Sequence, residues 1–106
     1  MPKTHSIYVI ELSKKVLNLK RFQEKNPNYE EGKPCVYVGM TGRTPEERFK
    51  QHKAGYKSSS IAKRFGLYLK PRHFKNLNPM TYEEAAKMEF KKAEKLRKKG
   101  WGVWVN

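Results

Sequence analysis

Cysteine, long apolar runs and acidic residues are scarce in this chain, and the first two absences exclude whole classes of protein. The one cysteine, Cys35, cannot form an intramolecular disulfide, and no second cysteine completes a zinc-binding set. No apolar run approaches the roughly 18 residues of a membrane span. The opening residues, Met-Pro-Lys-Thr-His, lack the apolar core of a signal peptide. We therefore expect a soluble, cytoplasmic protein with no membrane partner, in which Cys35 is a small buried residue.

The shortage of acidic residues points to a polyanionic partner. The chain has 24 Lys and Arg residues against 10 Asp and Glu residues, which gives a formal net charge of +14. Such a field attracts a phosphate backbone and releases counterions from it, whereas solubility alone does not require so large an excess of one sign. With 106 residues, 37% of them hydrophobic and no internal repeat, residues 1–106 are expected to form one domain that contacts nucleic acid.

Alternating apolar residues, capping residues and glycines divide the chain into an α/β (α+β) pattern. Between the first two expected strands, residues 13–34 show the least clear sequence pattern, which fits a short helix, a hairpin extension or a mobile loop. The two faces of residues 6–12 are both largely apolar, which indicates a central strand covered on both sides. Strands are expected at 6–12, 36–40, 67–69 and 100–106, and helices at 44–54, 60–65 and 81–99.

The stretch from Cys35 to His52 combines a buried strand, a glycine turn and a well-marked helix. Thr44 is suited to the N-cap, a proline follows at the first helical position, and Glu47 completes a Thr-x-x-Glu capping box. Arg48 and His52 are four residues apart on that helix, so they share one face. Together with Tyr37 on the strand, they form a polar group on rigid elements, which is either a site or only a surface.

Glu89 interrupts the apolar stripe of the last long helix, which we assign to Tyr82, Ala86, Glu89, Ala93 and Leu96. An ionised carboxylate on a core-facing stripe costs several kcal/mol unless it is paired or binds a metal. Glu89 therefore pairs with one of the many Lys and Arg residues, lies at the solvated edge of the stripe, or points into a functional site.

These residues together resemble the GIY-YIG nuclease domain. The first motif appears as Ser6-Ile7-Tyr8 and the second as Tyr37-Val38-Gly39. The arginine helix appears as Glu47-Arg48-Phe49-Lys50-Gln51-His52, and Glu89 stands where the family has the acid of its late helix. Each motif is weak alone, but their order and their positions on the expected elements are fairly specific.

The resemblance implies a central three-stranded antiparallel sheet flanked by helices and a hydrolase that cleaves phosphodiester bonds in DNA with one Mg²⁺ (or Mn²⁺). It implies that Glu89 holds the metal and that Tyr8 acts as general base or positions the attacking water. Tyr37 would help to place the water or a phosphate oxygen. Arg48 would stabilise charge in the transition state, and His52 would support the nucleophile or the leaving group.

The chain departs from the family pattern in its first motif, in the spacing that follows it, and in residues 56–60, where some members carry a further histidine. Ser6 replaces the usual glycine, and residues 13–34 form an insertion or elaborated loop that contacts substrate or only decorates the fold. The family's late asparagine corresponds at most to Asn106, at the end of the chain. Trp101 and Trp104 are interpreted as strand-end core residues, because no regular aromatic pattern supports base stacking.

The substrate and the activity stay open at this point. The exposed cations expected to track a nucleic-acid backbone are Lys57, Lys63, Arg64, Arg72 and Lys75, although any one of them could be a solvated side chain. DNA is the expected partner, with RNA and branched or damaged DNA as alternatives, and a stand-alone catalytic domain favours recruitment by a partner protein. The alternative to a nuclease is a non-catalytic basic DNA- or RNA-binding module of the same fold. A ribosome- or RNA-associated structural protein fits the charge but not the Tyr/Tyr/Arg/His/Glu set.

Overall fold

The sheet is built around β1, which lies between two antiparallel neighbours. The computed structural model of the protein describes residues 2–105. β1 pairs antiparallel with β2 and with β3, and β4 pairs parallel with β2, so the strand order is β3-β1-β2-β4. The strands are β1 (Ser6–Leu12), β2 (Cys35–Thr41), β3 (Gly66–Leu69) and β4 (Gly102–Val105). The expectation that the first strand is central is confirmed.

The α/β class is confirmed, but the observed sheet is mixed and has four strands rather than the three antiparallel strands expected. The difference is β4, which the sequence predicts as a strand without indicating its neighbour. Val103 of β4 is fully buried, and pairing with β2 places it in the core. A parallel neighbour requires a long crossover connection, here the segment from β2 through α4. A local sequence pattern does not reveal such a distant pairing.

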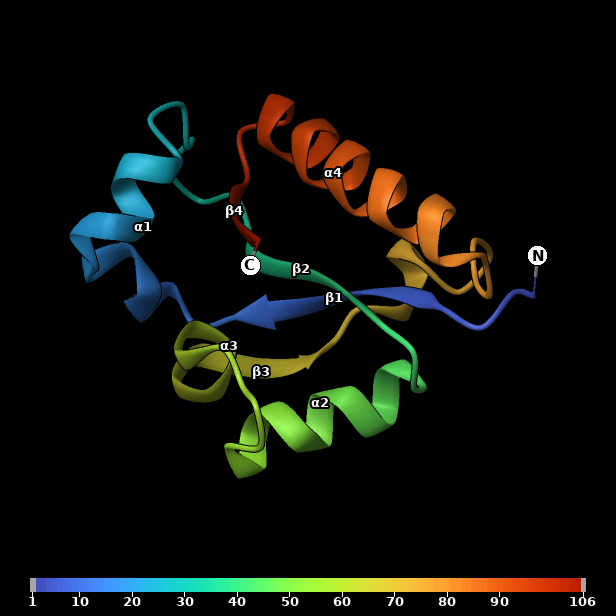
Figure 1. Ribbon diagram of the computed structural model, residues 1–106. Coiled ribbons are helices and arrows are strands. Elements are labelled where there is room, and N and C mark those ends of the chain that lie inside the picture. Colours follow the sequence, from blue (N-terminus) through green and yellow to red (C-terminus); the bar gives the residue numbers. More distant parts are fainter. Residues whose placement is uncertain (1, 106) are drawn as a thin grey trace.

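Helices cover both faces of the sheet (Figure 1). α2 (Pro45–Ala54) and α3 (Ser60–Phe65) lie on one side, and α4 (Tyr82–Lys98) lies on the other. The shorter helical segments are η1 (Lys14–Asn18), α1 (Lys20–Lys25) and η2 (Pro71–His73). None of the helices within residues 2–105 has the length and apolar character needed to cross a membrane.

The Thr44 N-cap of α2 and the capping box of α4 are confirmed, whereas the predicted capping box of α2 is incomplete, because the Glu47 carboxylate accepts from the Thr44 hydroxyl (3.0 Å) and not from the Thr44 backbone N–H. The Thr44 side chain accepts a hydrogen bond from the backbone N–H of Glu47 at 3.1 Å. Gly55 ends α2 with a φ of 87°, a backbone conformation that glycine adopts without strain. Thr81 and Glu84 form the reciprocal capping box at the start of α4.

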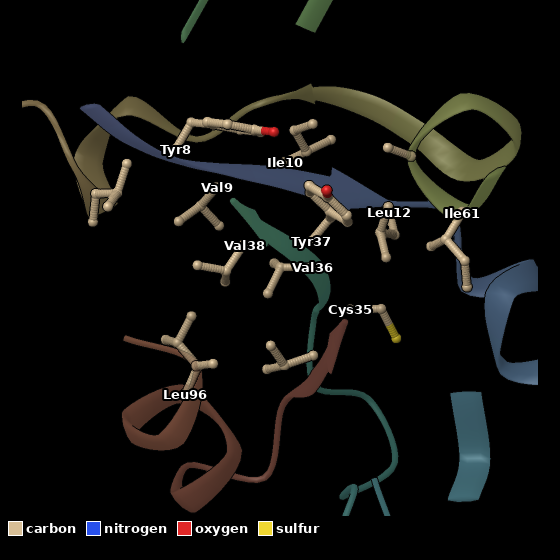
Figure 2. Close-up of a cluster of buried hydrophobic side chains, with 14 of the residues drawn as sticks. Tyr8, Val9, Ile10, Leu12, Cys35, Val36, Tyr37, Val38, Ile61 and Leu96 are labelled. Carbon is tan, nitrogen blue, oxygen red and sulfur yellow. The ribbon is translucent and has the colours of Figure 1, made fainter. Parts of the chain in front are cut away.

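The core fills both faces of β1 and β2 (Figure 2). Tyr8, Ile10 and Tyr37 point to the side of α2 and α3, whereas Val9 and Val38 point towards α4. This alternation follows from the two-residue period of a strand. Cys35 is buried and free, as expected. Both faces are therefore apolar, and the polar group formed by Tyr8, Tyr37 and His52 is set into one of them.

The apolar stripe of α4 differs from the expected one at its start. Ala85, Ala93 and Leu96 are buried, whereas Tyr82 is 58% exposed and Ala86 is also exposed. Tyr82 is the first helical residue, and its ring lies edge-on to His5 at the surface, 5.2 Å between centroids. The stripe thus begins at Ala85, four residues before Glu89, which remains in line with the buried residues.

Residues 13–34 form short helices that are anchored to the core, so the short-helix alternative is the observed one. Val16 and Phe22 are fully buried. The side chain of Asn26 donates to the carbonyl oxygens of Phe22 (2.9 Å) and Val103 (3.1 Å), and its oxygen accepts from the N–H of Val103 at 2.8 Å. Trp104 stacks on Phe22, 6.3 Å between centroids. This contact places Trp104 at the margin of the core, as expected, and ties the segment to β4.

Candidate functional site

The sheet register brings Tyr8 and Tyr37 together. Tyr8 lies opposite Gly39, and Tyr37 lies opposite Ile10, so the two tyrosines are diagonal neighbours on one face with ring centroids 6.0 Å apart. Gly39 makes this possible, because a Cβ there would lie 2.5 Å from Tyr8 Oη and 3.0 Å from Tyr37 Cε1. Any larger residue at position 39 displaces Tyr8. Both tyrosines are 1% exposed, so their hydroxyl groups lie inside the protein.

His52 is fully buried and bridges Tyr8 to the loop before α3. Its Nδ1 accepts a hydrogen bond from the backbone N–H of Ser59 at 3.2 Å, and its Nε2 lies 2.8 Å from Tyr8 Oη. Because Nδ1 is an acceptor, Nε2 carries the proton and donates to Tyr8. Burial, and then the charge of Arg48, lowers the pKa of His52 to about 4, so the ring is neutral at pH 7. His52 therefore orients the hydroxyl group of Tyr8 from inside the protein and has no contact with solvent.

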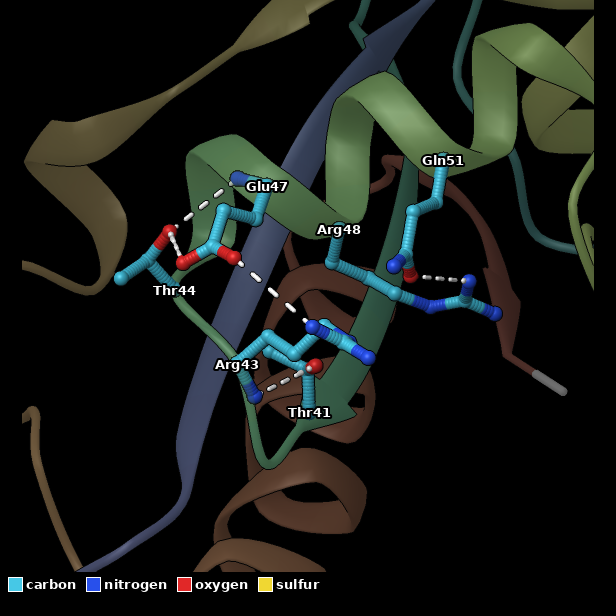
Figure 3. A network of polar contacts seen from close by, with 6 residues as sticks. All are labelled: Thr41, Arg43, Thr44, Glu47, Arg48 and Gln51. Carbon is cyan, nitrogen blue, oxygen red and sulfur yellow. Dashed lines mark hydrogen bonds and ion pairs between the residues drawn. The ribbon is translucent and has the colours of Figure 1, made fainter.

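Arg48 extends from α2 over a loop whose carbonyl groups it binds. Its guanidinium donates to the side-chain oxygen of Gln51 at 3.1 Å, to the carbonyl of Tyr56 at 3.2 Å and to that of Lys57 at 2.7 Å. Figure 3 shows Arg48 beside Gln51. It also shows Arg43 on the turn before α2, where the backbone N–H of Arg43 donates to the Thr41 hydroxyl and its guanidinium pairs with Glu47. The position of Arg48 is thus fixed by main-chain groups of residues 56 and 57.

A shallow hollow of about 310 Å³ opens beside Arg48. Its cationic residues are Arg43, Arg48 and Lys57, and no acidic residue lines it. The rest of its lining is Thr41, Gly42, Gln51 and Tyr56. Three cations around a small polar hollow provide a binding place for an anion such as a phosphate group.

The two tyrosines are protonated at neutral pH. Burial raises the pKa of Tyr8, and the positive charge of Arg48 only partly offsets that rise. Burial also raises the pKa of Tyr37, with further contributions from Tyr8. In its neutral form Tyr8 accepts from His52 and keeps its own proton to donate. In this arrangement Tyr8 orients a neighbouring group through a hydrogen bond instead of removing a proton.

Glu89, on α4, lacks a cationic partner within the described residues. Its charge contributes to the raised pKa values of both Tyr8 and Tyr37, which places the carboxylate within electrostatic range of the site. Burial raises the pKa of Glu89 itself. Among residues 2–105, the ion pairs closer than 4.0 Å join Arg43 to Glu47, Lys70 to Glu11 and Arg97 to Glu94, and none involves Glu89. Of the alternatives for Glu89, pairing with a Lys or Arg is therefore excluded within the described chain.

A half-buried carboxylate without a counter-ion fits a Mg²⁺ site of the kind that uses one protein carboxylate. Mg²⁺ retains several waters and takes further oxygen ligands from substrate phosphates. Within residues 2–105, no three His, Cys, Asp or Glu side chains gather in a metal-binding group. Glu89 thus fits a weakly held Mg²⁺ ion completed by substrate, and not a closed structural metal site.

The five expected backbone-tracking cations are all exposed but belong to separate segments. Lys57 lines the hollow beside Arg48, and the Lys63 side chain passes close to Gly55 at the end of α2. Arg64 lies over the ring of Phe65, 4.9 Å from its centroid. Arg72 and Lys75 follow β3, and Arg72 lines a different hollow with Tyr68. Of the five residues, only Lys57 lines the hollow beside Arg48.

Sequence reasoning missed the contribution of the loop between α2 and α3. Tyr56 and Lys57 bind Arg48, and Ser59 binds His52, through main-chain groups that leave no trace in residue type. The hydroxyl groups before α3 indicate only a helix cap, and Ser59 provides that cap.

Ser6 lies opposite Thr41 at the end of the β1–β2 pair, and Asn106 lies outside the described residues. No protein-family model, curated protein or solved structure matches this chain.

Proposed function

We propose that this protein is a divalent-metal-dependent endonuclease of the GIY-YIG type that hydrolyses phosphodiester bonds in DNA. Its chain order supports the proposal: Tyr8 on the first strand, Tyr37 on the second, Arg48 and His52 on the next helix, and Glu89 on the last. The antiparallel pairing of β1 with β2 and with β3, inside the four-stranded mixed sheet, also supports the proposal.

The unpaired carboxylate of Glu89 carries the proposal. In a chain with 24 cationic side chains, a half-buried Glu that serves only stability is expected to acquire a Lys or Arg partner. Glu89 instead has a pKa raised by burial, and its charge contributes to the raised pKa values of Tyr8 and Tyr37. An unfavourable charge held at one place in the fold is typical of functional sites.

Each side chain of the candidate site has its own role in the proposed phosphoryl transfer. Arg48, with Arg43 and Lys57 around the hollow, binds the phosphate and stabilises the charge that develops on it. Tyr8, oriented by His52, positions the attacking water or a phosphate oxygen by donating a hydrogen bond. When bound, Mg²⁺ supplies Lewis-acid polarisation of the phosphate and a lowered pKa of its water.

A plasmid-nicking assay with added Mg²⁺ tests the proposal. The wild-type protein is expected to convert supercoiled DNA to open-circle and linear forms, and Glu89→Gln is expected to lower the rate by at least about 100-fold. Glu94→Gln is the matched control, because Glu94 is on the same helix and pairs with Arg97 at 3.5 Å, outside the site. Equal rates for all three proteins, or intact DNA with each of them, would contradict a nuclease.

One observation favours the second candidate, a basic nucleic-acid-binding module without catalysis. Tyr8 and Tyr37 are 1% exposed and His52 is fully buried, so these side chains also satisfy one another as a polar core. Calorimetric titration with Mg²⁺ separates the two candidates. The nuclease binds Mg²⁺ through Glu89 and loses that binding in Glu89→Gln, whereas the binding module gives no heat in either protein but retains salt-dependent DNA binding.

A further inference from the structure

The outer face of α4 carries a regular row of lysines. Lys87, Lys91, Lys95 and Lys98 are spaced by four, four and three residues, so they share one side of the helix. All four are exposed. At a rise of 1.5 Å per residue the row extends over about 16 Å. We call these four residues the lysine ridge.

The needs of the helix itself do not explain the lysine ridge. Cations in the last turns of a helix offset its macrodipole, which accounts for Lys95 and Lys98. Lys87 and Lys91 lie in the middle of α4, where that effect has faded and where like charges four residues apart repel each other. Of the ion pairs within residues 2–105, none includes a lysine of the ridge. The ridge lysines are therefore free of close ion pairs within the described residues, and Glu84 is the acidic residue that lines a hollow beside Lys87 and Lys91.

An aromatic side chain stands beside this charge. Phe90 follows Lys87 by three residues and directly precedes Lys91, and it is 67% exposed. It is more exposed than Tyr82 at 58% and Leu67 at 55%. A line of cations next to an exposed aromatic ring is the combination with which proteins hold unpaired nucleic-acid strands: the cations follow the phosphates and the ring stacks on a base.

The lysine ridge consists of exposed residues of α4, whose buried residues are Ala85, Ala93 and Leu96. Arg48 is on α2, which lies on the other side of the sheet (Figure 1). We infer that the lysine ridge and Phe90 bind a single-stranded nucleic-acid segment, separate from the phosphate held beside Arg48. An anionic membrane surface is a poorer fit, because an interfacial helix needs a broad apolar face, and the exposed residues of α4 are mostly charged. This surface goes beyond the proposed function and does not depend on cleavage.

Fluorescence anisotropy with a labelled oligothymidine strand, measured without divalent metal at several salt concentrations, tests the inference. Replacing all four ridge lysines by Gln is expected to reduce the slope of log K against log salt by roughly 3, since each phosphate contact on a single strand contributes about 0.7. The matched control replaces four other exposed lysines, Lys3, Lys15, Lys20 and Lys33, by Gln and removes the same net charge. The control is expected to change the slope by less than about 1.

Phe90→Ala separates stacking from charge. It is expected to weaken binding of the oligothymidine strand about fivefold or more, with no change in the salt slope, because one stacked base is lost. Its affinity for a blunt duplex is expected to stay unchanged, because duplex bases are not available to the ring. Equal losses in the ridge and control variants, or full strand affinity in Phe90→Ala, would overturn the inference. So would ridge-dependent binding to phosphatidylserine vesicles without strand binding.

Discussion

The helices on opposite faces of the sheet are attached to it by different forces. α4 buries Ala85, Ala93 and Leu96 and is held by apolar packing. In α2 only His52 is fully buried, Phe49 packs partly buried against the core, and several polar contacts add to the attachment. Among these, Lys53 Nζ donates to the carbonyl of Gly66 at 2.8 Å. The helix that carries most of the proposed site thus has one fully buried side chain, which is polar. The helix that carries the acid has three, which are apolar, and a hydrogen bond from Arg97 to the carbonyl of Val103 at 3.1 Å.

This difference decides which variants are informative. In α2, Arg48 and His52 are both candidate site residues and attachments of the helix, so a loss of activity in their variants is mixed with a loss of stability. In α4, Glu89 has no ion-pair partner within the described residues, and Glu89→Gln keeps the size of the side chain, so we expect the packing of the helix to be preserved. Stability and activity are therefore expected to separate at Glu89 and to change together at Arg48 and His52.

The largest stability effect is expected at the apolar attachment of α4. Leu96 is 1% exposed, and Leu96→Ala leaves a cavity between α4 and the sheet. We expect the free energy of unfolding, measured with urea, to fall by about 2–5 kcal/mol. Lys95→Ala, at the exposed neighbouring position, is the control and should stay within about 0.5 kcal/mol of wild type. A small effect of Leu96→Ala would show that the hydrogen bonds of Arg97 to Asn26 and Val103, and not apolar packing, hold α4.

The second effect, at the polar attachment of α2, depends on pH. The buried His52 has a pKa of about 4, whereas an unfolded chain binds that proton near pH 6.5. The unfolded state therefore takes up more protons between these values, so the stabilisation is complete above pH 6.5 and declines as the pH falls towards 4. The decline due to His52 amounts to at most about 3 kcal/mol.

Urea unfolding of wild type and His52→Gln between pH 4 and 7 measures this contribution. The variant should lose part of the pH dependence, and the difference between the two proteins isolates His52. His73 serves as the internal reference, because burial also lowers its pKa and its contribution remains in both proteins. Parallel curves for the two proteins would mean that His52 is not held as a neutral ring.

The sequence predicts much of this architecture because its strongest signals are local. The caps at Thr44 and Thr81 and the central position of β1 depend on nearby residues, and each was correctly predicted. The neighbour of β4 and the start of the α4 stripe depend on distant packing. The expected stripe included Tyr82 and Ala86, but the helix begins at the surface, where Tyr82 meets His5. Periodicity predicts how far apart the residues of a stripe lie, whereas tertiary contacts determine at which residue the stripe begins.

The candidate site shows the same division. The sequence indicated Tyr8, Tyr37, Arg48 and Glu89 as candidates because they stand at the motif positions of the family that the chain resembles. Their surroundings were not visible. A main-chain carbonyl of Lys57 binds Arg48, and the Ser59 N–H fixes the tautomer of His52. The side chains of these two residues do not indicate either contact. Such groups are present at every position, so only the fold determines which of them reach a site.

A smaller loss is expected when the guanidinium of Arg48 is removed but its charge is kept. Arg48→Lys cannot reproduce the hydrogen bonds to Gln51, Tyr56 and Lys57 together, because an ammonium lacks the planar fork. We expect unfolding by urea to require about 1 kcal/mol less free energy than in wild type.

The control for Arg48→Lys is Arg43→Lys, whose ion pair with Glu47 is exposed and 3.9 Å long. This control should differ from wild type by less than about 0.5 kcal/mol. If both variants were equally stable, the carbonyl contacts of Arg48 would have no role in attaching the loop to α2.

The smallest effect on stability, with the opposite sign, is expected at Glu89. Burial raises its pKa, so the ionised carboxylate costs the folded state free energy that grows as the pH rises from the unfolded-state pKa near 4.5. Glu89→Gln should therefore match wild type at pH 4 and exceed it at pH 7 by roughly 0.5 kcal/mol. Added Mg²⁺ should raise the melting temperature of wild type and leave that of Glu89→Gln unchanged, because a ligand stabilises only the protein that binds it. Glu94→Gln should respond to Mg²⁺ as wild type does, and destabilisation by Glu89→Gln at pH 7 would show that Glu89 attaches α4 to the sheet after all.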